Sequence, residues 1–342
     1  MSEIDYTPPE PPDFWVTRLD QIEENLKGFK KWDVREICKS AGGRPVWAAT
    51  WGPKKEINRT SNLSASMGGG HPESFWGEDV THQCLMVVAG VHGAETEGMG
   101  AAVHFMHVIE NGRDLRGREW PQITKYADDM RLVVVPAANP DGRARVTVAS
   151  MIGMETEQFV YWAQGAWKSG ENIGYPACKR YQPLDPDSVG FLGGYPNDDG
   201  YNIMHDATPG DIRTAEAQAI IDLALDEAPD CILNVHSHGM GPNLLGNPVR
   251  LPGYQERQKG MSERIVRIQE EHGLRPVPYR YGAGYNMNSA LHFGCGAVAV
   301  TFEGPHGLAS NPYTYEEILD CHLTALEGVL GYGAEQGFRP PR

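Results

Sequence analysis

Near-continuous hydrophobic runs alternate along the chain with segments in which hydrophobic positions recur at helical spacing. The runs are typical of strands covered on both faces and lie at residues 83–90, 130–139, 230–236 and 296–303. The segments with helical spacing lie at residues 18–32, 97–112, 211–228, 253–273 and 314–333. This alternation predicts an α/β fold, a single domain with a mixed, mostly parallel central sheet and helices on both faces.

Three stretches lack this regularity. Residues 1–15 are rich in proline and are expected to be extended, and residues 53–82 are polar and rich in glycine and serine, which predicts a surface loop. Residues 150–210 are rich in glycine, proline, tyrosine and aspartate, and a loop of this length is usually functional. Since no internal repeat and no linker is visible, we expect residues 1–342 to form a single domain.

Composition and charge narrow the class of protein. The formal net charge is −15, which disfavours nucleic acid and anionic membrane surfaces as partners, because both would be repelled. No window approaches the roughly 20 apolar residues that a membrane span needs, and the N-terminal residues do not resemble a secretory signal. The six cysteines are scattered without a C-x-x-C pair, which favours reduced thiols and a cytoplasmic location.

Polar residues follow three of the predicted strands at their carboxyl ends. The first strand runs into His92-Gly-Ala-Glu95, the second ends in His236-Ser-His238, and the third ends in Glu303-Gly-Pro-His306. Ligands bind beyond the carboxyl ends of strands in open α/β sheets, so these ionisable groups are expected to converge in space.

These residue types suggest a catalytic zinc site. Such a site commonly takes two histidines and a carboxylate and leaves one position for water. His92, Glu95 and His236 supply that set, and Glu303 is placed to accept a proton from the water. Each residue could also have a purely structural role; Glu95, for example, could stabilise the N-terminus of a helix. Glu97 is an alternative candidate for the carboxylate ligand. Because the three polar strand ends are expected at the same edge of the sheet, we favour the interpretation that they form a metal site.

Several motifs resemble those of one enzyme family. GVHGAETEG resembles the H-x-x-E zinc motif of the M14 zinc metallocarboxypeptidases and the related aspartoacylase and succinylglutamate desuccinylase group. NVHSHG resembles the strand with their second histidine, and TFEGPHG the strand with their catalytic glutamate. SAGGRPVWAATWG, ANPDGRAR and YRYGAGYNMNSA agree with further family segments in the same order. The resemblance covers roughly residues 20–335.

The resemblance implies roles for individual residues. His92, Glu95 and His236 would bind one Zn²⁺, and Glu303 would act as general base and then as general acid. Tyr285 would correspond to the mobile substrate-side tyrosine. A cation would stabilise the developing oxyanion, and among Arg143, Arg145, Lys179 and Arg180 the resemblance favours Arg180.

The chain also departs from the family pattern. The segment that usually carries an Asn-Arg pair for the substrate's terminal carboxylate reads GYNIMHD here, with Met204 and His205 at those positions. Methionine cannot replace a bidentate arginine contact, and His205 offers a weaker one. Arg143, Asn202 and His205 are nevertheless expected to contact substrate.

The expected activity is zinc-dependent hydrolysis of an amide bond in a peptide or an amide-containing small molecule. The leading hypothesis is a metallocarboxypeptidase with an atypical pocket for the substrate's terminal carboxylate. A zinc amidase or deacylase of N-acyl or amidated substrates is the first alternative, since the Asn-Arg pair is missing. A peptide-binding pseudoenzyme is the second, and the retained Glu303 counts against it. A serine hydrolase is disfavoured because the sequence contains no G-x-S-x-G motif.

Overall fold

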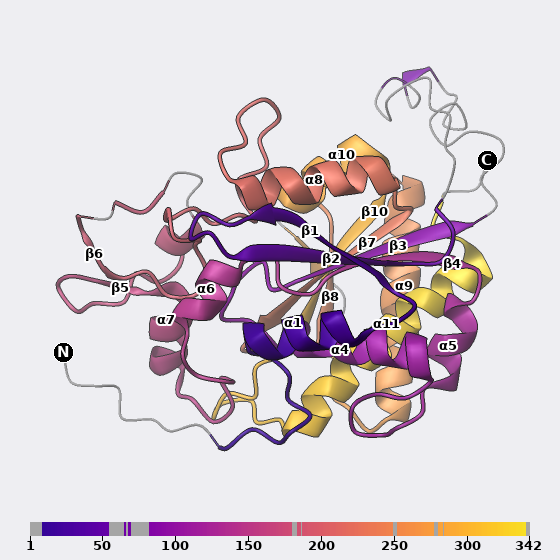
Figure 1. Ribbon diagram of the computed structural model, residues 1–342, viewed down its shortest axis with the longest axis horizontal. Helices are drawn as coiled ribbons and strands as arrows, with labels where there is room; N and C mark the ends of the chain where they lie inside the picture. The colour runs from indigo at the N-terminus through magenta and orange to yellow at the C-terminus, as the bar shows by residue number, and fades with distance from the viewer. Residues whose placement is uncertain are drawn as a thin grey trace.

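A mixed sheet runs through the molecule (Figure 1). The structure is a computed structural model that describes residues 9–54, 65, 68–69, 82–179, 183–185, 187–248, 252–276, 280–282 and 284–339. Within these residues eight strands pair in the order β1-β2-β4-β3-β7-β10-β8-β9. Their bounds are β1 (Asp33–Lys39), β2 (Pro45–Trp51), β3 (Gln83–Ala89), β4 (Met130–Val135), β7 (Cys231–His238), β8 (Asn243–Gly246), β9 (Arg280–Tyr281) and β10 (Val298–Pro305).

The four central strands are parallel. β4, β3, β7 and β10 pair in parallel, whereas β1 and β2 pair antiparallel at one edge and β8 joins β10 antiparallel at the other. All four parallel strands therefore end at the same edge of the sheet. The predicted α/β fold with a mostly parallel central sheet is confirmed.

Helices cover both faces of this sheet (Figure 1). One face carries α1 (Leu19–Gly28), α4 (Thr96–Asn111), α5 (Pro121–Ala127), α9 (Pro252–Glu271) and α11 (Tyr315–Gln336). The other face carries α8 (Ala215–Glu227) and α10 (Met287–Cys295). These helices correspond to the five segments of helical spacing, except that α5 and α10 were not expected from the pattern.

β3 shows why the central strands are hydrophobic almost throughout. Leu85 and Val87 pack into the core beneath α4, whereas Met86 and Val88 point to the opposite core beneath α8 and α10. Successive strand side chains alternate between faces, so a strand covered on both sides leaves few positions for polar residues, such as Asn234 in β7 and Thr301 in β10. A polar residue at the end of such a strand is then conspicuous in the sequence.

The irregular stretches behave differently from one another. Residues 150–210, expected as loop, contain α7 (Thr156–Gln164), β5 (Ala166–Trp167), the 3-10 turn η1 (Ala177–Lys179) and β6 (Val189–Phe191). This segment forms most of a small hydrophobic cluster, including Met151, Ala163 and Leu184, which Ala94 and Leu308 help to complete from outside it. Residues 9–15 carry no helix or strand. Residues 1–8 and most of the predicted loop at 53–82 lie outside the described residues.

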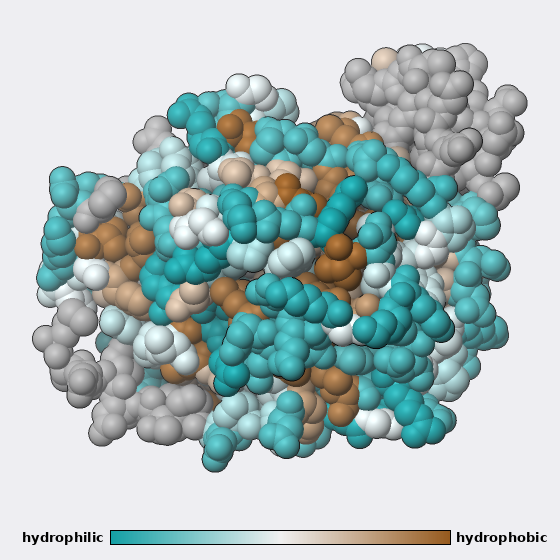
Figure 2. All heavy atoms as spheres, viewed as in Figure 1, coloured by the Kyte–Doolittle hydropathy of each residue, from teal (hydrophilic) through white to brown (hydrophobic). Residues whose placement is uncertain are grey.

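The surface is largely hydrophilic on the face seen in Figure 2, with hydrophobic patches at the end that carries α7, β5 and β6 and also over the middle and the lower part of the view. Among the helices of the described residues, none has the length and apolar character that a bilayer crossing requires. All six cysteines are free thiols, and five of them are buried.

Candidate metal centre and active site

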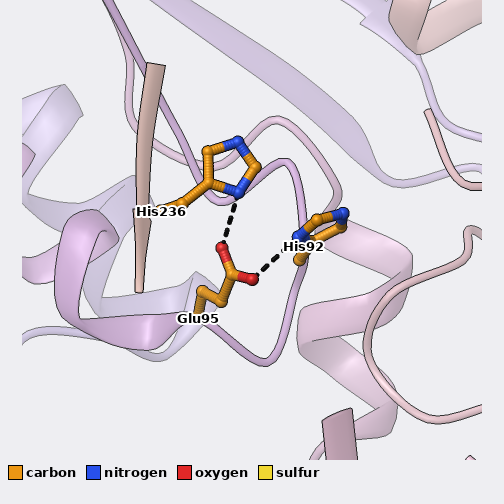
Figure 3. A group of neighbouring side chains, drawn as sticks. All are labelled: His92, Glu95 and His236. Atoms are coloured by element: carbon orange, nitrogen blue, oxygen red, sulfur yellow. Dashed lines mark hydrogen bonds and ion pairs between the residues drawn. The ribbon is translucent and has the colours of Figure 1, made fainter. Parts of the chain in front are cut away.

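His92, Glu95 and His236 meet at the carboxyl edge of the sheet (Figure 3). Their ligand atoms all lie within 4.8 Å of one another, and all three residues are buried. The Nδ1 atom of His92 lies 2.7 Å from Glu95 Oε1, and the Nδ1 atom of His236 lies 2.8 Å from Glu95 Oε2. Two imidazole nitrogens and a carboxylate thus face a common point, as the sequence predicted.

The loop after β3 brings the first two of these residues together. The chain leaves the sheet through Gly90, whose φ of +66° favours glycine, and Glu95 is the residue before α4. A Cβ on Gly93 would lie 2.1 Å from the Arg143 backbone nitrogen, so only glycine allows this loop to approach so closely. His236 comes from β7, the strand beside β3.

Asn202 fixes the orientation of the His92 ring. Its Oδ1 lies 3.2 Å from His92 Nε2 and accepts the backbone N–H of Met204. Its Nδ2 donates to the Cys178 carbonyl oxygen at 3.2 Å, which shows that Oδ1 is the atom facing His92. A hydrogen on His92 Nε2 can be donated to this oxygen, which leaves Nδ1 as the ring nitrogen that would bind a metal ion.

The charges of the three residues are strongly linked. Burial opposes ionisation of Glu95, but the two histidines outweigh it and hold the pKa of the carboxyl well below its usual range. Burial lowers the pKa of His92, whereas at His236 the Glu95 carboxylate overcomes burial and raises the pKa. An ionised carboxylate between two imidazoles is the donor set that zinc prefers in catalytic sites, so these residues fit the ion.

Glu303 lies beside the metal ligands. It is the Cα partner of His236 across the parallel pair of β10 and β7, which puts both side chains on the same side of the sheet. Both residues line one cavity of about 330 Å³ together with His92 and Glu95. Burial raises the pKa of Glu303. A carboxyl group of raised pKa beside a metal centre suits proton transfer.

The residues expected on the substrate side lie apart from one another. Met204 and His205 line the cavity. Arg143 does not: its buried guanidinium donates to the carbonyl oxygens of Thr17 and Val146, which contradicts the predicted contact with substrate. Asn202 is also absent from the described lining of the cavity, and its side chain contacts His92 as described above. Arg180 lies outside the described residues.

Tyr285 is half-buried and stands away from the cavity wall. Its hydroxyl donates to the Ala207 carbonyl oxygen at 3.3 Å, and it is absent from the described residues that line the cavity. Its role as the mobile tyrosine stays a prediction that requires the side chain to move.

Two residues near the centre that were alternative candidates for metal ligands, Glu97 and His238, form hydrogen bonds with other groups. Glu97 lies in the first turn of α4 and accepts a hydrogen bond from His306 Nδ1 at 3.1 Å, so Glu95 is the carboxylate at the metal centre. His238 lines the cavity, but its Nδ1 accepts the backbone N–H of Met240.

Sequence reasoning missed one residue of the centre and underrated another. Tyr195 stacks on the His92 ring with 3.9 Å between centroids and an angle of 10°, and it lines the cavity. Lys179, weighed only as a neighbour of Arg180, lines the cavity as well. Both lie in the stretch 150–210, where no periodic pattern marks them.

Two of the sequence motifs meet at a buried carboxylate that supports this stretch. Asp141 accepts hydrogen bonds from the Ser40 hydroxyl at 2.5 Å, from the Gly42 N–H at 2.8 Å and from Arg44 at 2.8 Å. Asp198 joins the network through its backbone N–H at 3.2 Å. The S-x-x-G-R and N-P-D-G segments thus hold the chain just before Asn202.

The fold and site together define a metal hydrolase of the carboxypeptidase type. Residues 27–239 match the family described as zinc carboxypeptidase, a range that includes the three metal-ligand candidates and ends before Glu303. This chain belongs to the zinc carboxypeptidase family, and its class is zinc metallopeptidase. A search of curated protein sequences finds no match.

Solved structures show the same fold at low sequence identity. A metallo-carboxypeptidase from Burkholderia cenocepacia shares 13% identity with a TM-score of 0.57, covering 91% of this chain and 67% of that one. The carboxypeptidase A from Helicoverpa armigera shares 15% identity with a TM-score of 0.55, covering 94% and 74%. A Pseudomonas aeruginosa metallo-carboxypeptidase in complex with (2-guanidinoethylmercapto)succinic acid shares 13% identity with a TM-score of 0.55, covering 94% and 68%.

Proposed function

We propose that this protein hydrolyses a peptide or amide bond, with His92, Glu95 and His236 holding zinc and Glu303 transferring the proton. The observation that carries the proposal is the position of Glu303. Its side chain shares a cavity with all three ligand candidates and lies in register with His236. A protein that only binds peptides has no need of a proton acceptor at this place, which counts against a pseudoenzyme.

The side chains have distinct tasks in this proposal. Zinc, when bound, supplies Lewis acidity that polarises the scissile carbonyl and activates water. Glu303 accepts the proton of the attacking water and delivers it to the leaving amine. Its raised pKa helps the second step, because burial stabilises the protonated carboxyl that must carry the proton. Asn202 and Tyr195 keep the His92 ring in place.

The family match supports a metallocarboxypeptidase as the leading candidate, with an atypical carboxylate pocket. Met204 offers no charge, and burial lowers the pKa of His205 to about 3, so this imidazole is neutral near pH 7. Neither residue then supplies the cation that a terminal carboxylate requires. A zinc amidase or deacylase is the second candidate, and this neutral wall is the observation that favours it.

The substitution Glu303→Gln tests the proposed catalytic role. Glutamine keeps the size of the side chain but cannot accept the proton, so kcat should fall by roughly 10²–10⁴-fold while one zinc per chain is retained. Zinc content is measured by metal analysis, and turnover on N-acetyl dipeptides with free and with amidated C-termini. Full activity of this variant would refute the role of Glu303. Cleavage of amides alone by the wild-type protein would favour the amidase.

The proposal also includes a reducing compartment such as the cytoplasm. All six thiols are free, and burial raises the pKa of Cys231 and Cys321 well above the usual value, which keeps these thiols protonated and inert. Localisation of a tagged full-length chain by cell fractionation tests this part.

A further inference from the structure

The cavity contains one positively charged side chain among its described lining residues. The metal-ligand candidates and Glu303 occupy one wall, and most other polar groups are uncharged, such as Asn286, Asn288 and Thr301. Lys179 is the only lysine or arginine of the described lining. An acidic protein with a net charge of −15 thus places a cation next to its candidate reaction centre.

Lys179 has no carboxylate partner within the part of the chain that the structure describes. None of the ion pairs found there includes it, and its ammonium lies 5.9 Å from the centre of the Tyr175 ring, which is 74% exposed at the cavity mouth. Its charge nevertheless reaches the site. The pKa of His205 is lowered to about 3, chiefly by burial and in part by the charges of His92 and Lys179.

The backbone around Lys179 is tied to the metal centre. Lys179 ends the 3-10 turn η1, where its N–H donates to the Pro176 carbonyl oxygen at 3.0 Å. The preceding carbonyl, that of Cys178, accepts a hydrogen bond from Asn202 Nδ2, and the same Asn202 side chain bonds to His92. One amide therefore connects the segment that carries the cation to a metal ligand and sets their relative position.

We propose that Lys179 is a specificity-determining residue that binds a carboxylate of the substrate. The inference rests on the proposed function and names its substrate class: amides or peptides that carry a free carboxylate near the scissile bond. The ammonium acts as a point charge, without the two parallel hydrogen bonds of an arginine fork. Such a contact tolerates more than one carboxylate position, as expected where Met204 and His205 provide no second cation.

Binding to an inactive enzyme tests this inference without requiring turnover. The protein carrying Glu303→Gln is loaded with zinc and titrated by calorimetry with N-acetyl-Ala-Ser, N-acetyl-Ala-Asn and N-acetyl-Ala-Leu, each as free acid and as amide. We expect the acids to bind more tightly. Adding Lys179→Met should reduce the preference for acid over amide by about 10- to 100-fold, the range of a charge-assisted hydrogen bond. Lys179→Arg should restore most of the preference.

A matched control is Lys168→Met in the same segment. Lys168 is exposed and donates to the Asp187 carbonyl oxygen, so its loss should leave the preference for acids unchanged. Circular dichroism and zinc content of each variant show whether the fold and the metal site persist.

Three results would overturn the inference. The first is equal binding of acids and amides by the parent protein, and the second is an unchanged preference in Lys179→Met. The third is a loss of kcat in Lys179→Met that is equal for acid and amide substrates of the otherwise wild-type enzyme, since that result assigns Lys179 to the oxyanion. Failure of the proposed function looks different: the wild-type protein then cleaves neither series, whatever the calorimetry shows.

Discussion

The two sides of the cavity are built in different ways. The metal side consists of residues on or next to β3, β7 and β10, where each backbone is fixed by hydrogen bonds to two neighbouring strands. The substrate side consists largely of residues from the irregular stretch before α8, including Lys179, Met204 and His205. The position of this stretch depends on side-chain contacts, among them the hydrogen bond from Asn202 to the Cys178 carbonyl oxygen and that from the Asp198 N–H to Asp141.

This difference suggests a division of labour. The chemistry requires fixed distances between ligands and proton acceptor, and strands of a buried sheet hold such distances well. Recognition of substrate varies with the ligand, and an irregular segment accepts new residues without disturbing the sheet. Substitutions should therefore affect either metal binding and turnover or substrate preference, and only a few residues should affect both.

The largest effect is expected on the metal side. His236→Ala removes one of the three zinc-ligand candidates and leaves the Glu95 carboxylate buried beside a single imidazole. Zinc should be lost at neutral pH, and hydrolysis should fall to background, as it should in the wild-type protein after treatment with a chelator. Metal analysis and activity after re-addition of zinc check this outcome. After zinc is added back, the chelated wild-type protein should recover its activity and the variant should not. Activity in the zinc-free variant would contradict the proposed role of these residues in binding a catalytic zinc.

Asn202 is expected to act on both sides, and two substitutions separate its contacts. Asn202→Ala removes the acceptor of His92 Nε2 and should weaken zinc binding by about 10- to 100-fold. Asn202→Asp keeps that acceptor but loses the donor to Cys178, so zinc affinity should stay high while KM for free-acid substrates rises. Zinc competition assays and steady-state kinetics measure the two effects. Identical behaviour of both variants would show that the sides are not separable at this residue.

A smaller effect is expected from crowding the loop that carries the ligands. Gly93→Ala places a methyl group against the Arg143 backbone and should lower the free energy of unfolding by about 1–3 kcal/mol. Gly28→Ala at the end of α1 is the control, since a Cβ there meets nothing within 4 Å and its φ is not positive. Urea titrations of the zinc-free proteins compare them. Equal stability of both variants would contradict the close packing of the loop.

The metal side could be predicted from the sequence because each of its residues interrupts a regular pattern. His92, His236 and Glu303 stand at the ends of hydrophobic runs, and the topology of an α/β sheet brings such ends together. The substrate side could not be predicted in this way. Tyr195 and Lys179 lie among glycines, prolines and aspartates without periodicity. Their positions depend on contacts with distant residues, such as the bond from the Tyr195 N–H to the Ala163 carbonyl oxygen and that from Asn202 to the Cys178 carbonyl oxygen.

Similarity of motifs also misled in places. Arg143 follows the N-P-D-G segment and was expected near substrate, but it lies in the first helical turns after Asn139 and points to the Thr17 carbonyl oxygen. Asn202 was expected at the substrate and serves the His92 ring. A sequence position next to a motif does not fix the direction of a side chain, which depends on the helix phase and on the partners that folding supplies.

The small hydrophobic cluster beneath α7, β5 and β6 has a consequence for the history of this enzyme. The segment supplies most of this core, and Ala94, Val146 and Leu308 complete it from outside. The segment can therefore be lengthened, shortened or exchanged if these contacts are retained together with the attachment next to Gly194, where the backbone touches the loop of Gly93. Grafting the corresponding segment of a relative onto this scaffold would then be a practical route to altered selectivity, with the three metal-ligand candidates left unchanged.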